Sequence, residues 1–208
     1  MPYYNLAEIC NKVACRFSDL NEGRDKVLKT QREVIRCASL SIRAIHRGEF
    51  DLAKNILLEA SERFKEIEDI LNRYKELYYS GYLLDSQKEF AEAHITYALV
   101  NNMPLPDPDE LGVEHSSYMN GMGEAIGEMR RYILDKIRHD DFENGDKILD
   151  IMDELYCALT SMDYPDAITK GLRRTTDIAR SIIEKTRGDL TQNLSQKRLI
   201  SKLSLLGK

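Results

Sequence analysis

Two pairs of glutamates have a spacing that could hold a divalent cation. Glu89 and Glu92 are three residues apart, and Glu124 and Glu128 are four residues apart. In a helix, either spacing places both side chains on one face. Carboxylate oxygens suit Mg²⁺, Mn²⁺ or Ca²⁺ rather than zinc, and four carboxylates converging from two helices would repel one another without such a cation. Because the chain holds 35 acidic residues, each pair alone also fits a solvated helix face.

A second candidate group is cationic. Between Arg24 and Arg47 the chain has seven Lys or Arg and only two acids. At about 100° per residue, five of these cations fall within an arc of roughly 60°, and the apolar residues of the segment occupy a different arc. These five residues, called the basic stripe below, are Lys29, Arg32, Arg36, Arg43 and Arg47. Guanidinium groups one turn apart suit a row of phosphates, although cations paired with acids elsewhere would give the same pattern.

Several classes of site find no support in the sequence. There is no DxDxDG, HExxH, GxxxxGK[ST] or GxSxG motif, so calcium loops, zincins, P-loop enzymes and serine hydrolases are not indicated. The four cysteines lack CxxC spacing, which predicts reduced, buried thiols rather than disulfides or a zinc site. The histidines do not cluster, and we interpret them as core or surface residues. The net charge of −5 argues against a protein that binds nucleic acid over its whole surface. It is compatible with a local basic stripe.

The elements that must position these groups are helices. Glycine and proline breaks, including Ser80-Gly81 and Asn144-Gly145, divide the chain into helical stretches, and no stretch alternates with period two. The predicted helices cover 23–47, 49–79, 84–101, 116–139, 145–161 and 165–187. We therefore expect an all-α fold, a single domain over 1–208 built as one bundle of about six to seven long helices. Residues 1–22 would be an N-terminal segment, and 189–208 a tail with room for a short helix.

No apolar run approaches the roughly 18–20 residues needed to span a bilayer. The N-terminal residues have neither a basic region nor an apolar core of the kind found in secretory signals. These features predict a cytoplasmic protein without a membrane partner.

Three segments, in order along the chain, resemble the translin family. The stretch 87–93, QKEFAEA, is similar to the family's Q-E-Y-V-E-A segment, and 118–130, YMNGMGEAIGEMR, is similar to the pattern Y-x-x-G-x-x-D-x-x-G-E. The stretch from Thr30 to Arg36, with Ile45-His-Arg47 at the end of the same helix, resembles the family's basic first helix. The similarity runs from about Arg24 to Gly188 and is closer to translin-associated factor X than to translin. The chain looks like a self-sufficient prokaryotic homologue.

This resemblance implies a translin-like helical fold and a Mg²⁺-dependent (or Mn²⁺-dependent) endoribonuclease. The enzyme would cut single-stranded RNA inside a homo-oligomeric shell, most simply an octamer. The resemblance to the family places the catalytic and metal-binding acids at Glu89, Glu92, Glu124 and Glu128, and it places the phosphate contacts at the basic stripe. One departure is Glu124, where the family pattern has Asp, because the extra methylene moves the carboxylate by more than about 1 Å. The alternatives are a non-catalytic module that binds single-stranded RNA or DNA, and a helical scaffold that binds no nucleic acid.

Overall fold

The computed structural model describes residues 5–78, 83–139 and 145–206. Within these ranges the regular elements are all helices, which confirms the all-α prediction. Six of them are long: α1 (Leu6–His46), α2 (Phe50–Arg73), α4 (Leu84–Val100), α6 (His115–Arg138), α7 (Gly145–Thr160) and α9 (Leu172–Leu206). Three have four residues each: α3 (Lys75–Tyr78), α5 (Pro108–Leu111) and α8 (Asp166–Thr169). The predicted second helix, 49–79, is not continuous, because Tyr74 has a non-helical φ of −128° and ψ of 73° and separates α2 from α3. Its predicted end at 79, the break at Ser80-Gly81 and Asn144 lie outside the described residues, as do 1–4 and 207–208 of the predicted terminal segments.

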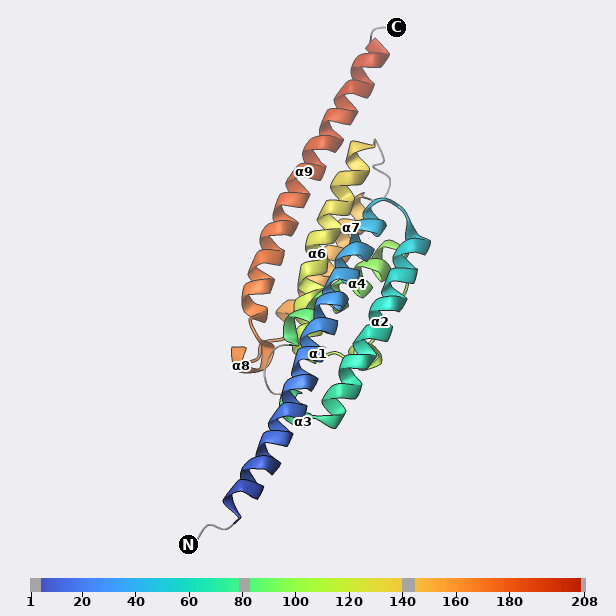
Figure 1. Cartoon of the computed structure of the whole chain (residues 1–208). Coiled ribbons are helices and arrows are strands. Elements are labelled where there is room, and N and C mark those ends of the chain that lie inside the picture. The colour runs from blue at the N-terminus through green and yellow to red at the C-terminus, as the bar shows by residue number, and fades with distance from the viewer. Residues whose placement is uncertain (1–4, 79–82, 140–144, 207–208) are drawn as a thin grey trace.

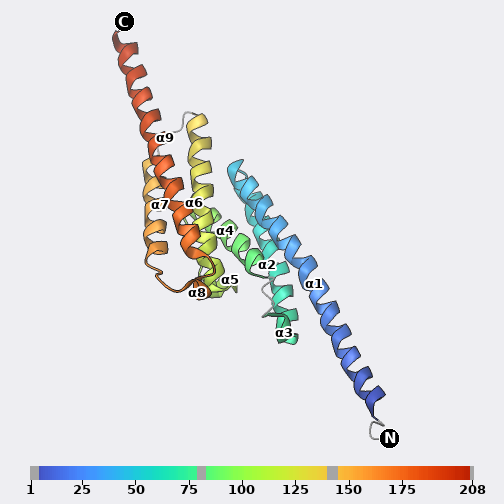
Figure 2. The same cartoon turned by 90° about the vertical axis from the view of Figure 1, so that its left-hand side faces the viewer.

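The long helices pack in two halves around α4 and α6 (Figures 1 and 2). Helix α1 packs on α2 and α4, and α6 packs on α4, α7 and α9. Large apolar side chains such as Phe90, Ile126, Met129 and Met152 are buried between them. Each contributes about 1.5–3 kcal/mol by leaving water. The α4–α6 pair is therefore the centre of the molecule, and it is also the pair that carries the four glutamates.

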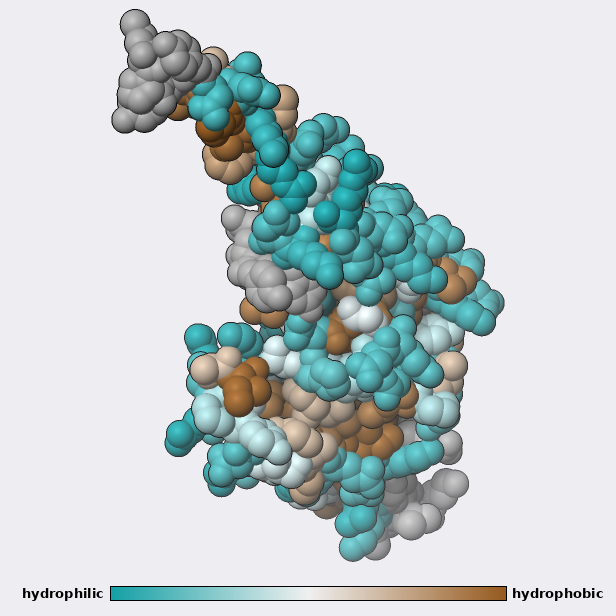
Figure 3. All heavy atoms as spheres, turned by 90° about the horizontal axis from the view of Figure 1, so that it is seen from below, coloured by the Kyte–Doolittle hydropathy of each residue, from teal (hydrophilic) through white to brown (hydrophobic). Residues whose placement is uncertain are grey.

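Helix α1 begins at Leu6, not near Gly23 as the sequence suggested. Gly23 is buried inside the helix, where an added Cβ would lie 3.0 Å from the ring of Tyr74. The glycine therefore permits close packing of α1 and does not end it. The residues before it form an exposed arm with an apolar stripe at helical spacing, and Figure 3 shows hydrophobic atoms on the projecting arm. The stripe consists of Leu6, Ile9, Val13 and Phe17.

The C-terminal end of the chain also differs from expectation. The predicted helix 165–187 is divided at Lys170 and Gly171, both of which have positive φ, into α8 and α9. Helix α9 then runs through Gly188 to Leu206, so the predicted tail is the second half of a long helix. Leu190 is buried where α9 packs against α6 and α7. Beyond it, the exposed side chains of Leu199, Ile200 and Leu203 lie on an arm at the opposite end of the molecule from the α1 arm (Figure 1).

The four cysteines are free thiols, as predicted. Only Cys37 is buried, however, and the expectation of burial is wrong for Cys10, Cys15 and Cys157, which lie on solvent-facing positions of α1 and α7. None of the helices in the described ranges combines the length and the apolar composition that a membrane crossing requires.

Candidate metal centre and nucleic-acid interface

Helices α4 and α6 cross closely because a glycine lies at the crossing. A Cβ on Gly121 would lie 2.7 Å from the carbonyl oxygen of Lys88 and 3.0 Å from the amide nitrogen of Glu92. A side chain at this position would therefore strike the backbone of α4. Gly123, two residues further along, faces the Thr175 side chain of α9 instead. Gly121 and Gly123 thus allow close packing beside the site, and Gly121 is the one that brings α4 near.

Three glutamates meet at this crossing. Carboxylate oxygens of Glu89, Glu92 and Glu124 all lie within 4.8 Å of one another. The first two come from successive turns of α4 and the third from α6, one turn after Gly121. The arrangement offers three oxygen ligands to one hard cation, and Mg²⁺ and Mn²⁺ are bound in this way by carboxylates. The structure thus brings together three of the four predicted acids.

The electrostatics of the cluster favour a positive charge. Glu92 is buried, and burial raises its pKa to about 8, with the charge of Glu124 the next largest cause. Burial and the same neighbour also raise the pKa of Glu89. The two raised pKa values mean that too little positive charge lies near the cluster to stabilise three ionised carboxylates. A divalent cation would supply that charge, so the donor set and its burial fit Mg²⁺ or Mn²⁺.

A lysine lies at the edge of the cluster. Lys88 Nζ is 2.8 Å from Oε1 of Glu124. Burial alone would lower the pKa of Lys88, but the hydrogen bond to Glu124 and the surrounding acids raise it, so the ammonium stays charged. Lys88 neutralises one carboxylate of the three and leaves the cluster with an excess of negative charge when all are ionised.

The fourth glutamate has different partners. Oε2 of Glu128 lies 2.5 Å from Nε2 of His46, at the end of α1. The same oxygen lies 3.7 Å from Arg131 on the next turn of α6. Nδ1 of His46 lies 3.7 Å from Asp135, and the His46 side chain is only 4% exposed. Glu128 therefore lies in the same cleft as the three-carboxylate cluster, but its closest contact is with His46 of α1.

All four glutamates line one cleft of about 490 Å³ between α1, α4, α6 and α9. Of the basic stripe, Arg43 lines this cleft, together with Arg131. A neighbouring cleft of about 640 Å³ continues between the end of α1 and α6, where Arg43, Arg47, Arg131 and Lys136 lie on its walls together with one acid, Asp135. A phosphate backbone that follows the two clefts would thus pass from the acids to a run of cations.

The rest of the basic stripe forms an exposed ridge. Lys29, Arg32 and Arg36 are solvent-exposed on α1, and none of them lines either cleft. The apolar arc of the same helix is buried as predicted, through Val34 and Ile45 among others. Among the described residues only Arg47 of the stripe forms an ion pair, with Glu49 at 2.8 Å. The idea that the stripe is neutralised by acids elsewhere in the chain therefore applies to one of its five members.

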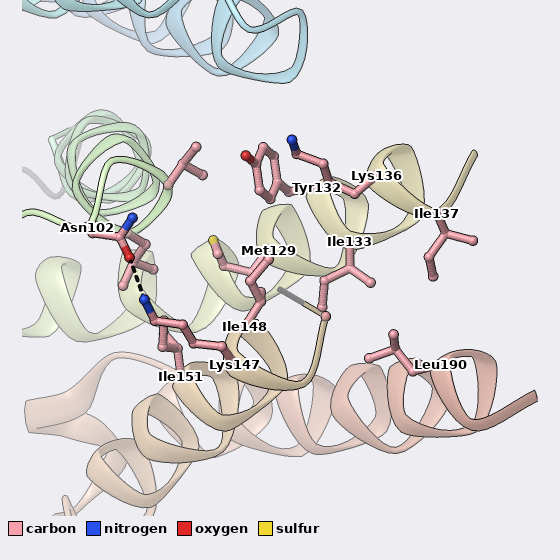
Figure 4. A pocket seen from close by; sticks show the side chains of 13 residues that line it. Asn102, Met129, Tyr132, Ile133, Lys136, Ile137, Lys147, Ile148, Ile151 and Leu190 are labelled. Atoms are coloured by element: carbon pink, nitrogen blue, oxygen red, sulfur yellow. Dashed lines mark hydrogen bonds between the residues drawn. The ribbon is translucent and has the colours of Figure 1, made fainter. Parts of the chain in front are cut away.

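A separate cavity of about 120 Å³ lies between α6, α7 and α9, with one wall from the end of α4 (Figure 4). Most of the residues that line it are apolar, including Met129, Ile133, Ile148 and Leu190. A hydrogen bond of 3.1 Å joins Lys147 to Asn102 at its rim. Its lining residues include Tyr132, Lys136 and Lys147 but none of the four predicted glutamates, so it is separate from the acidic cleft.

Comparison with known proteins adds sequence and structural relatives. No family model matches the chain. An uncharacterised protein of Methanocaldococcus jannaschii is 32% identical over 187 residues, covering 88% of this chain and 82% of that protein.

The crystal structure of AfC3PO is 30% identical with a TM-score of 0.81, covering 91% of this chain and 97% of that one. The chain belongs to the translin family. AfC3PO has also been solved in complex with duplex RNA, with a TM-score of 0.82 at 29% identity over the same shares of the two chains. Apo-NeC3PO, with a TM-score of 0.81 at 20% identity and 88% and 96% coverage, shares the fold.

Two residues of this translin-family site were missed from the sequence. Lys88 is the only Lys or Arg between Leu84 and Asn101, but its partner Glu124 lies on another helix, so the local sequence does not identify the contact. His46 was interpreted as an ordinary core or surface histidine. Its partner is 82 residues away, so nothing in the local sequence connects it to Glu128.

Proposed function

We propose that this translin-family protein is a metal-dependent endoribonuclease of the kind that translin-associated factor X represents. The observation that carries the proposal is the cluster of Glu89, Glu92 and Glu124, whose oxygens lie within 4.8 Å of one another in a cleft. A solvated acidic face would not bury Glu92 or raise its pKa to about 8. The cluster supports a cation site, and the cations along the adjoining cleft support a phosphodiester substrate.

In this proposal the three glutamates hold Mg²⁺ or Mn²⁺. When bound, the ion neutralises charge on the scissile phosphate and favours in-line attack by water. Arg43 would contact a phosphate next to the scissile one, and Arg47 would contact the following stretch of backbone at the end of α1. Such contacts position the chain without reading its sequence. Lys88 would hold Glu124 by its hydrogen bond and thereby fix the orientation of one ligand.

We propose RNA as the substrate, with a single strand as the form that is cut. The complex of the relative AfC3PO with duplex RNA makes a double strand a second candidate. We also propose that the protein assembles into a homo-oligomer, most simply an octameric shell. The exposed apolar stripes on the α1 and α9 arms support this, since a chain alone in water leaves them unburied.

The test of the proposed function is an RNA cleavage assay with the purified protein. We expect cleavage of single-stranded RNA in Mg²⁺ or Mn²⁺ and none after EDTA, with activity restored when excess metal is returned. Calcium, which is larger and prefers more ligands, should support binding better than turnover. Cleavage that persists in EDTA would contradict the proposal.

A binding module without catalytic activity is the alternative. The observation that favours it is the Lys88–Glu124 ion pair, because an ammonium 2.8 Å from a carboxylate partly replaces a metal. The two functions separate in one measurement. A binding module would retain RNA at full affinity but leave it intact in every metal tested.

The exposed ridge yields a further expectation on binding. The double substitution Arg32→Ala and Arg36→Ala should weaken binding of single-stranded RNA regardless of its sequence. The slope of log K against log salt should fall by about 0.7 for each phosphate that the protein no longer neutralises. Fluorescence anisotropy over a salt series measures both quantities. The matched control is Lys54→Ala with Lys65→Ala on α2, which removes the same charge from a different exposed surface. Equal effects of the two doubles would mean that only net charge matters.

A further inference from the structure

The cavity of Figure 4 has a buried end and an exposed end. Met129, Ile133 and Leu190 line it and are almost fully buried, with exposed fractions of 1%, 1% and 2%. Lys147 and Asn102 also line it, and both are exposed. The cavity therefore leads from a polar mouth, which solvent reaches, to an apolar floor inside the core.

The floor is a void among core side chains. The volume of the cavity is about 120 Å³. A cavity of about 150 Å³ lined by apolar side chains is large enough to hold a benzene molecule. Protein cores contain few voids larger than a water molecule, because the side chains around a void lose dispersion contacts. An apolar group of about six carbons would restore these contacts.

The mouth of the cavity is cationic. Lys136 of α6 and Lys147 of α7 line it, and no Asp or Glu does so among the described residues. Nζ of Lys147 donates a hydrogen bond of 3.1 Å to Oδ1 of Asn102, at the end of α4 (Figure 4). An ammonium group has three N–H donors, so this bond holds the side chain at the mouth and leaves two donors for a ligand.

Lys136 belongs to a different wall. Its Nζ lies 5.6 Å from the centre of the Tyr132 ring, one turn earlier on α6, and this ring also lines the cavity. Lysines from two helices thus lie beside one apolar void. That combination matches a ligand with an apolar body and a negatively charged group, because the void suits the body and the lysines suit the charge.

We propose that this cavity binds a small amphipathic anion, a carboxylate with an apolar body of about six carbons. The body lies between Met129, Ile133 and Leu190, and the carboxylate accepts a charge-assisted hydrogen bond from Lys147. Lys136 supplies the second positive charge. A neutral molecule of the same shape gains only the apolar contacts, and a cationic one is repelled. The site is independent of the glutamates and of the proposed endoribonuclease function.

Three probes of similar shape test the proposal: phenylacetate, phenylacetamide and phenethylamine. Each is titrated into the full chain, isotope-labelled at its methionine methyl groups, and followed by NMR. Phenylacetate should shift the Met129 signal, because the phenyl ring then lies beside this side chain. Met162, which does not line the cavity, should be unaffected. Phenylacetate should bind about fivefold to tenfold more tightly than phenylacetamide, and phenethylamine more weakly than either.

A pair of lysine variants tests the charge at the mouth. Lys147→Met removes the charge and keeps an unbranched side chain, so it should weaken phenylacetate binding about fivefold and leave phenylacetamide binding unchanged. The matched control is Lys185→Met, which removes the same charge from an exposed position of α9 that does not line the cavity. This control should bind both probes as the parental protein does.

A third variant fills the void. Ile151 is half-buried and lines the cavity. In Ile151→Phe the added ring should occupy the floor, abolish binding of phenylacetate and phenylacetamide, and leave the Tm at or above the parental value. Lys147 is exposed, so its variant tests the proposal even if Ile151→Phe lowers the Tm.

Three results would overturn the proposal. The first is a Met129 signal that no probe shifts. The second is equal affinity for phenylacetate and phenylacetamide, or an equal loss of phenylacetate binding in Lys147→Met and Lys185→Met, because the lysine at the mouth would then not select an anion. The third is a folded Ile151→Phe variant that still binds phenylacetate with parental affinity, which would place the ligand elsewhere. None of these results depends on whether the protein cleaves RNA.

Discussion

Replacing Glu92 with Gln is expected to abolish RNA cleavage and to stabilise the metal-free protein. Gln keeps the shape and the hydrogen-bonding reach of the side chain but removes the negative charge that a hard cation needs. Because Glu92 is the most buried of the three clustered acids, its loss leaves two partly exposed ligands. Glu89→Gln and Glu124→Gln should also abolish cleavage, and RNA binding should be intact in all three variants. Cleavage by all three at the parental rate would end the enzyme proposal and leave the translin-like binding module.

The stability effect has a defined pH dependence. In the folded protein the pKa of Glu92 is about 8, above its ordinary value of 4.5, so folding favours the neutral form. As pH rises from about 4.5 to 8 the metal-free parental protein loses stability, because ionisation becomes easier in the unfolded chain. Glu92→Gln lacks this loss and should gain on the order of 3 kcal/mol over the parental protein at pH 7, since one pKa unit is about 1.4 kcal/mol. The gain should vanish below about pH 4.5.

Urea unfolding in EDTA at pH 4.5, 7 and 8 measures this difference. The matched control is Asp189→Asn, because Asp189 accepts a hydrogen bond of 2.7 Å from Arg130 and joins α9 to α6. Neutralising that acid should lower stability at pH 7, or leave it unchanged. A Glu92→Gln variant that is less stable than the parental protein at pH 8 would mean that Glu92 is a structural acid with an ordinary ion pair.

The sequence predicts the helix ends well where the helix packs against other helices of the chain and a glycine or proline marks its end. Glycine, proline and the apolar periodicity place both ends of α4, α6 and α7 within one residue or two. One error is the break at Tyr74, which divides the predicted helix 49–79 into α2 and α3. The larger errors lie at the two ends of the described chain, in α1 and α9. There the apolar stripes face solvent, so neither core packing nor a break defines the helix, and Gly23 resembles a helix start although it is a packing contact with Tyr74.

The candidate site likewise has a part that the sequence predicts and a part that only the tertiary structure determines. Helical spacing alone places Glu89 with Glu92 and Glu124 with Glu128, each pair on one face. Which members of the two pairs meet depends on how α4 crosses α6, and that crossing is determined by the backbone contact at Gly121. The roles of Lys88 and His46 depend on tertiary contacts over 36 and 82 residues of sequence. Local pattern could therefore identify the acids but not the residues that hold them.

The same crossing leads to the second large effect. Gly121→Ala should destabilise the protein by about 1–3 kcal/mol, because the new Cβ lies 2.7 Å from a backbone oxygen that cannot turn away. The helices must move apart, and the two carboxylates of α4 then separate from Glu124. We expect Mn²⁺ affinity to fall at least tenfold and RNA cleavage to be abolished. Thermal unfolding and Mn²⁺ titration of the variant measure the two effects.

Gly127→Ala is the matched control, six residues further along the same helix. Its Cβ would meet only the Cδ1 atom of Ile182, at an ordinary contact distance of 3.7 Å. Since alanine is favoured over glycine inside a helix, this variant should be more stable by about 1 kcal/mol and should keep Mn²⁺ binding. Opposite signs for the two substitutions would place the requirement for glycine at the α4 contact. If Gly121→Ala were also stabilising and bound Mn²⁺ normally, the close crossing would not be what assembles the three glutamates.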